Sequence, residues 1–167
     1  LLMTNNDILR RLRYTFDFDD SKMIAVFGLA NHEVTRGQIS DWLKKEDHEE
    51  FVEMTDYQLA VFLNGLIVEK RGRKEGEQPE PEEELDNNLI LRKIKIALNL
   101  KSHDIVDVLS LAGRKVSPTE ISAFLRNPSH RHYKYCNDQY LRGLMSGIQK
   151  KYRTDDASSN EVKDAPV

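Results

Sequence analysis

The sequence predicts an all-α protein made of two tandem four-helix repeats that pack together as one globule. Two observations lead to this prediction. The chain aligns with itself without a gap when it is shifted by 82 positions. Each aligned half carries apolar residues at i, i+3 and i+4, which is the spacing of helices with one buried face. No convincing period-2 pattern indicates a strand.

The duplication relates Asn5–Arg71 to Asn87–Arg153. Roughly 17 of these 67 aligned positions are identical, and most others keep their polarity. A chance match over this length would need gaps. The similarity is plainest where each copy starts, with NNDILRRLR in the first and NNLILRKIK in the second.

Four amphipathic helices are predicted in each repeat, in the same order. A repeat of about 65 residues has only a marginal core by itself, so we expect the two repeats to pack against each other. The apolar stripes of the first and second repeats are, in order, Ile8, Leu9, Leu12 and Phe16 with Ile90, Leu91, Ile94 and Leu98; Met23, Ile24 and Phe27 with Ile105, Val106 and Leu109; Ile39, Trp42 and Leu43 with Ile121, Phe124 and Leu125; and Leu59, Phe62, Leu63 and Leu66 with Leu141, Leu144, Met145 and Ile148.

The third and fourth helices have recognisable start signals. Thr35, Ser117 and Thr55 each precede a Gln or Glu by three residues, which fits a capping box. In such a box the hydroxyl accepts from the amide three residues on, and the longer side chain reaches back. The last helix of the second repeat is expected to begin after Asn137.

Gly65 and Gly147 lie inside the predicted fourth helices, where a glycine costs about 1 kcal/mol relative to alanine. Because both repeats keep it, we expect another helix to approach closely at this position. The sequence has no visible phosphate-binding loop, dinucleotide glycine pattern or Ser/His/Asp set. We therefore expect no enzymatic activity and no cofactor.

Charge divides the chain into four segments. The first repeat, residues 5–72, carries a net charge of −4, and RKEGEQPEPEEELD at residues 73–86 carries −5. The second repeat, residues 87–153, carries +9, and residues 154–167 carry −3. Because Glu and Pro dominate residues 73–86, we expect an extended acidic linker there. By the same reasoning residues 154–167 are expected to be a disordered tail.

The single cysteine, Cys136, excludes an internal disulfide framework and favours a reducing compartment. No apolar run approaches the roughly 18 residues that a membrane span needs. The opening LLMTNND is too short and too polar for a signal peptide. We therefore expect a cytoplasmic protein that does not enter a membrane.

The doubled NN-x-ILR openings, ISDWLKKEDHEEF from Ile39 and FLNGLIVEKRG from Phe62 resemble the YehS-like family of bacterial proteins. The resemblance covers nearly everything from Met3 to Arg153. It implies two tandem copies of one small helical domain. It brings no assigned function and no catalytic residues.

Apolar residues beyond the shared stripe mark the fourth helix of the first repeat. Val61, Ile67 and Val68 stand where the second repeat has Gly, Gln and Lys. Surplus apolar area indicates either the seam between the repeats or the seat of a partner. We therefore predict a non-enzymatic binding module, protein-interacting or regulatory, with these three residues at its interface. Its partner would be an unidentified protein or a second copy of the chain.

Nucleic-acid binding through the basic second repeat is the alternative. Its lysines and arginines could contact phosphates, and the aromatic rings in NPSHRHYKYCND could stack on bases. The acidic linker and tail could instead lie on this face and compete with outside phosphates. The residues assigned to this alternative are Arg92, Lys93, Lys95, Arg126, Arg131, His132 and Lys134.

The stretch that carries His130, His132 and Cys136 could suggest a metal site, but zinc needs further ligands at a recognisable spacing. We expect no metal. Cys136 stands in the place of Met54 and is expected to be a buried small hydrophobe. His48 matches His130, and we expect both to be hydrogen-bonded structural residues.

The loops after the third helices carry opposite charge, with Glu49 and Glu50 matching Arg131 and His132. We hypothesise that the repeats pack around a pseudo-two-fold axis near these loops, so that the opposite charges meet.

Overall fold

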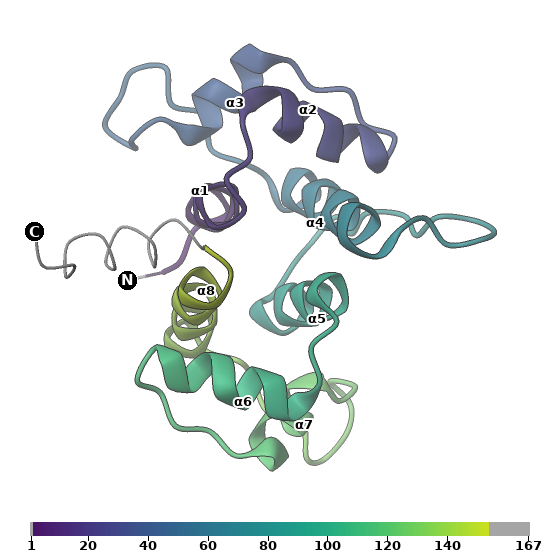
Figure 1. Ribbon diagram of the computed structural model, residues 1–167, viewed down its shortest axis with the longest axis vertical. Coiled ribbons are helices and arrows are strands. Elements are labelled where there is room, and N and C mark those ends of the chain that lie inside the picture. Colours follow the sequence, from purple (N-terminus) through teal and green to yellow (C-terminus); the bar gives the residue numbers. More distant parts are fainter. Residues whose placement is uncertain (1, 154–167) are drawn as a thin grey trace, which may run out of the picture.

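The computed structural model describes residues 2–153, and this part of the chain contains α-helices and no strand (Figure 1). The predicted all-α architecture of two tandem four-helix repeats is confirmed. No helix in this part is both long and apolar enough to cross a membrane. The expected tail, residues 154–167, lies outside the described residues. The helices are α1 (Asn5–Thr15), α2 (Asp20–Leu29), α3 (Arg36–Leu43), α4 (Asp56–Arg71), α5 (Asn87–Leu98), α6 (Ser102–Leu111), α7 (Pro118–Leu125) and α8 (Asp138–Tyr152).

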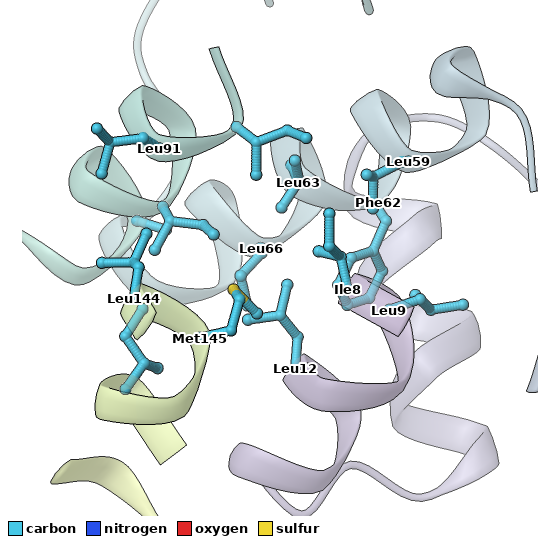
Figure 2. Packing of buried hydrophobic residues seen from close by; sticks show 14 of the residues in the cluster. Ile8, Leu9, Leu12, Leu59, Phe62, Leu63, Leu66, Leu91, Leu144 and Met145 are labelled. Carbon is cyan, nitrogen blue, oxygen red and sulfur yellow. The ribbon is translucent and has the colours of Figure 1, made fainter. Parts of the chain in front are cut away.

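The repeats are joined by an exchange of partners between their first and last helices. α1 packs beside α8 of the other repeat, and α5 packs beside α4. These four helices surround the middle of the molecule, with α2 and α3 at one end and α6 and α7 at the other (Figure 1). Leu12, Leu66 and Met145 meet in this middle and are fully buried (Figure 2). Each repeat therefore completes its core with the other.

The second asparagine of each NN pair ties the first helix of its repeat to the loop before the fourth. Asn6 Nδ2 donates to the carbonyls of Trp42 and Val52, both at 2.9 Å. Asn6 Oδ1 accepts from the amide of Met54 at 2.9 Å. Asn88 repeats all three bonds with the matched backbone groups of the second repeat. The side chain of Asn6 is buried, so these bonds replace water that it has lost.

The first asparagine of each pair meets an aspartate that also reaches the other repeat. Asp138 Oδ1 accepts from Asn87 Nδ2 at 2.7 Å, and its Oδ2 accepts from the amide of Met3 at 2.8 Å. Asp56 makes the same two kinds of contact with Asn5 and with the chain just before α5. One carboxylate at the start of each fourth helix thus holds both repeats.

The repeated glycines mark close helix crossings, as the sequence predicts. A Cβ atom on Gly65 would lie 2.0 Å from the carbonyl oxygen of Val26 in α2. A Cβ on Gly147 would lie 2.0 Å from that of Val108 in α6. Only glycine allows α4 and α8 to approach their neighbours this closely.

The expected contact between oppositely charged loops is wrong. The loop between α3 and α4 and the loop between α7 and α8 lie at opposite ends of the molecule (Figure 1). Glu50 pairs with Lys44 of its own loop at 2.6 Å. The pseudo-two-fold relation runs through the four central helices and not through these loops.

Replacing Gly65 by alanine should destabilise the protein by about 3 kcal/mol, because the added methyl would clash with backbone that cannot move aside. Gly28→Ala is the matched control: Gly28 is also in a helix, and its added Cβ would meet no atom within 4 Å. That change should be neutral or stabilise by up to about 1 kcal/mol. Urea unfolding measures both, and equal effects would contradict the close crossing.

The hydrogen bond from Asn87, with a further one from the amide of Met3, holds the pKa of Asp138 below its usual range. A lowered folded-state pKa stabilises the fold above the unfolded-state pKa, and this contribution is lost as pH falls through the folded-state pKa. Asp138→Asn should therefore lower stability at pH 7 and weaken the loss of stability below about pH 4. Denaturant unfolding across pH 2.5–7 tests this, and identical pH profiles for the two proteins would refute it.

Candidate functional site

The helix exchange creates two matching seams, one between α4 and α5 and one between α1 and α8. The linker lies along the first seam, since Glu82 reaches α5 and the amide of Leu85 reaches the start of α4. The second seam contains a hollow of about 540 Å³, which we call the α1–α8 groove. Its lining residues are Met3, Asp7, Arg10, Arg11, Tyr14, Arg142 and Gln149.

A buried lysine lies in the first seam. Lys93 of α5 is only 6% exposed, and its Nζ donates to Asn64 Oδ1 of α4 at 2.5 Å. Glu82 Oε2 of the linker lies 2.8 Å from the same Nζ, as an ion pair without hydrogen-bond geometry. A buried ammonium needs such compensation, because an unpaired buried charge is strongly destabilising. The acidic linker therefore neutralises this seam.

Arg11 is the counterpart of Lys93 in the second seam, 82 positions earlier. It is partly exposed and lines the α1–α8 groove. Ser146 stands where the first seam has Asn64, and it lines an adjoining hollow of about 650 Å³ together with Arg11 and Arg114. Within residues 2–153 the guanidinium of Arg11 has no hydrogen-bond or ion-pair partner. The second seam thus keeps the cation and lacks the carboxylate.

The two seams differ because matched positions on α4 and α8 carry different kinds of side chain. Positions spaced by four and then three residues lie on one side of a helix. On α4 this face is mostly apolar, and α4 packs closely on α5. On α8 the matched positions are charged or polar, and they line the two hollows. The three pairs, α4 residue first, are Ala60 with Arg142, Asn64 with Ser146, and Ile67 with Gln149.

The acidic groups in the groove are already engaged. Asp7 pairs with Arg10 at 3.0 Å, and Arg10 also donates to the carbonyl of Lys44 at 3.1 Å. Asp138, in the adjoining hollow, accepts from Asn87 and from Met3. Three further guanidinium groups, those of Arg11, Arg114 and Arg142, line the two hollows, and Arg142 already interacts with the charge of Asp138. The surface therefore favours an anion, which guanidinium groups can bind through two parallel hydrogen bonds.

The predicted apolar interface is corrected at one of its three positions. Val61 is completely buried, so its side chain belongs to the interior and offers nothing to a partner. Ile67 and Val68 are partly exposed, and Ile67 packs on the edge of the core. The place of Ile67 and Val68 at a partner interface therefore stays a prediction.

The predicted nucleic-acid residues are brought together only in part. Arg92 and Arg126 line one hollow of about 330 Å³, where Glu84 and Asp86 of the linker lie beside them. Arg92 also donates to the carbonyl that ends α7, as Arg10 does near the end of α3. Lys93 lies in the interior, where the linker neutralises it, so its assignment to phosphate contact is corrected.

The other four residues of that set are scattered. Lys134 pairs with Glu120 at 3.2 Å, and this ion pair raises the pKa of Lys134 and lowers that of Glu120. Arg131 and His132 are exposed in the loop before α8, and Lys95 is partly exposed on α5. The exposed lysine in this group is therefore already balanced by an acid.

The histidines and the cysteine have the structural roles that the sequence predicts. His48 Nδ1 and His130 Nδ1 each accept from the amide two residues on, at 3.0 Å. Cys136 is 2% exposed, and burial raises the pKa of its thiol to about 12. Within residues 2–153 no group of three or more His, Cys, Asp or Glu side chains could hold a metal ion.

Sequence reasoning missed Arg11 and Arg142 as site residues. The arginines of α1 lie in the repeat whose net charge is −4, so the net charge of that repeat gives no sign of a cationic site. One signal in the sequence could have found them. Arg11 matches another cation, Lys93, whereas Arg142 on the facing helix matches an alanine, Ala60. The meaning of this difference becomes clear only once α1 is known to face α8.

Comparisons with known proteins agree with the duplication. The model of a family described as "Protein of unknown function (DUF1456)" matches residues 5–72 and again residues 87–154. The chain is 42% identical over 147 residues to "Uncharacterized protein YehS" of Escherichia coli (strain K12). This alignment covers 87% of the chain and 94% of that relative. No solved structure matches the chain.

Removing the linker carboxylate should leave the ammonium of Lys93 poorly compensated. Glu82→Gln should therefore cost about 1–3 kcal/mol, at the low end for a buried pair because Glu82 is 32% exposed. Adding Lys93→Met should recover most of this loss, since an apolar side chain needs no counter-charge. The exposed neighbour Glu83→Gln is the control and should change stability by less than about 0.5 kcal/mol. Urea unfolding measures the three free-energy changes. If the change in the double variant equals the sum of the changes in the two single variants, the pairing is contradicted.

Proposed function

The chain belongs to the DUF1456 family, whose function is unknown, and we propose from the geometry of its seams that it is a protein-interaction module. Its α1–α8 groove binds an extended, acidic stretch of polypeptide, and it does so without catalysis. The observation that carries this proposal is the contrast between Lys93, paired with Glu82, and its counterpart Arg11, which has no such partner within residues 2–153.

The linker supplies the pattern for the ligand. Residues 73–86 contain seven acidic residues and form no helix, yet they lie against a seam and place a carboxylate on its cation. The α1–α8 groove has the same helical framework with more positive charge. A carboxylate on an extended backbone therefore fits it by analogy with the first seam.

Arginine suits this role better than lysine would. The guanidinium group presents several donors in a fixed plane and can hold a carboxylate through two of them. It is also more weakly hydrated than an ammonium group, so it loses less when a ligand covers it. The groove lies between α1 and α8, so an extended chain can run along both helices.

Nucleic-acid binding has weaker support from the same contacts. Phosphates would need Arg92 and Arg126, but Glu84 and Asp86 line the same hollow and would repel them. Lys93 and Lys134 are already paired with acids. The binding assay described next therefore includes an oligonucleotide, which tests this alternative.

A labelled peptide with the sequence of residues 75–86, EGEQPEPEEELD, should bind the full chain, with an affinity that falls as salt is added. Arg11→Glu should weaken this binding by about tenfold or more, because it places a like charge where the carboxylate binds. Fluorescence anisotropy measures both.

Arg36→Glu is the matched control, since Arg36 is an exposed arginine of α3 that pairs with Asp20 away from the groove. It should leave the affinity unchanged. If the peptide binds Arg11→Glu as tightly as the unaltered chain, the α1–α8 groove is not its binding site. A single-stranded oligonucleotide whose binding is lost in Arg126→Glu and kept in Arg11→Glu would instead favour the nucleic-acid alternative.

A further inference from the structure

We propose that residues 154–167 of this same chain are an acidic segment that binds in the α1–α8 groove, with Asp164 facing Arg11 as Glu82 faces Lys93. This inference rests on the proposed function, because it names an occupant for the same groove. The segment would compete with any acidic partner and so regulate its access.

The proposed register extends the repeat shift beyond Arg71 and Arg153, where the matched positions end. The shift of 82 positions that matches the two repeats also places residues 72–85 over residues 154–167. Glu82 falls on Asp164 under this shift, and both are carboxylates. Under the proposal, Asp164 would stand to Arg11 as Glu82 stands to Lys93.

The end of α8 is attached to α1 at the groove through Arg153. Arg153, the last described residue, donates to the carbonyl of Tyr14, and its guanidinium lies 3.8 Å from the centre of the Tyr14 ring. Tyr14 lines one end of the groove. The Arg153 side chain thus ties the end of α8 to a residue that lines the groove.

Length and charge both allow the segment to return along the groove. A helix of 15 residues is about 22 Å long, whereas 14 extended residues span up to about 46 Å. Residues 154–167 contain four acidic residues and one lysine, opposite in sign to the arginines of the groove. The linker shows that such a composition, which builds no core by itself, can still lie on a seam and pair with it.

A tethered competitor has a high effective concentration, commonly in the millimolar range for a short connection. A free acidic partner would therefore bind the groove only by displacing the segment or after the segment is neutralised. The competing segment is part of the same chain, so the strength of its competition does not depend on protein concentration.

Two measurements on the full-length protein test this. The first is the affinity for the EGEQPEPEEELD peptide, compared between the unaltered chain and a variant with Asp155→Asn, Asp156→Asn, Glu161→Gln and Asp164→Asn. We expect the neutralised variant to bind about tenfold more tightly, because its own segment no longer competes.

The second uses a nitroxide label on Val162→Cys and records the amide NMR signals of the full chain. The native Cys136 is 2% exposed and stays unlabelled. We expect broadening at Arg10, Arg11 and Gln149, and none at Arg36. Arg11→Glu should remove this broadening, while Arg36→Glu should leave it.

The outcomes separate the two proposals. Broadening at the groove that depends on Arg11 supports the inference, whether or not the added peptide binds. If the added peptide binds neither protein, only the proposed binding of a separate partner is contradicted. A peptide that binds both chains equally, through Arg11, supports the function and overturns the inference. Absence of broadening at the groove also overturns the inference.

Discussion

Each repeat lays its first helix against the last helix of the other repeat, and this exchange decides where the charged residues of the central helices point. It brings α5 onto α4 and α1 onto α8, so every position on one seam has a counterpart on the other. Asp56 and Asp138 fix the exchange, since each binds an asparagine of its own repeat and a backbone amide of the chain just before the other repeat. The glycine crossings then set the distance to the outer helices.

Two seams with one geometry can carry different chemistry. In the first, a buried lysine donates to an amide oxygen and is neutralised by a carboxylate of the linker, which lies along the seam. In the second, the matching cation is an arginine, and Arg142 and Ser146 replace smaller or amide-bearing neighbours. Burying a charge without a partner is costly, so an arginine at this place must remain partly hydrated or find an anion. That requirement is the physical basis for an acidic ligand.

The fold could be predicted because its signals are local and occur twice. Helical stripes, capping boxes and the repeated Gly65 and Gly147 each depend on residues a few positions apart, and the structure bears them out. The groove could not be predicted in the same way, because it depends on which helix of one repeat faces which helix of the other. Charge summed over a repeat gives no signal for Arg11, and the sequence does not show that α4 is enclosed on several sides, which buries Val61.

The two seams are counterparts, and the proposed ligand of the second is a carboxylate at Arg11. The most direct measurement follows the side-chain Nε–Hε NMR signals of the arginines while the acidic peptide is added to the chain with residues 154–167 neutralised. The Arg11 signal should shift and saturate along the binding curve, while that of Arg36 stays in place. A peptide that binds while the Arg11 signal does not move would contradict the account.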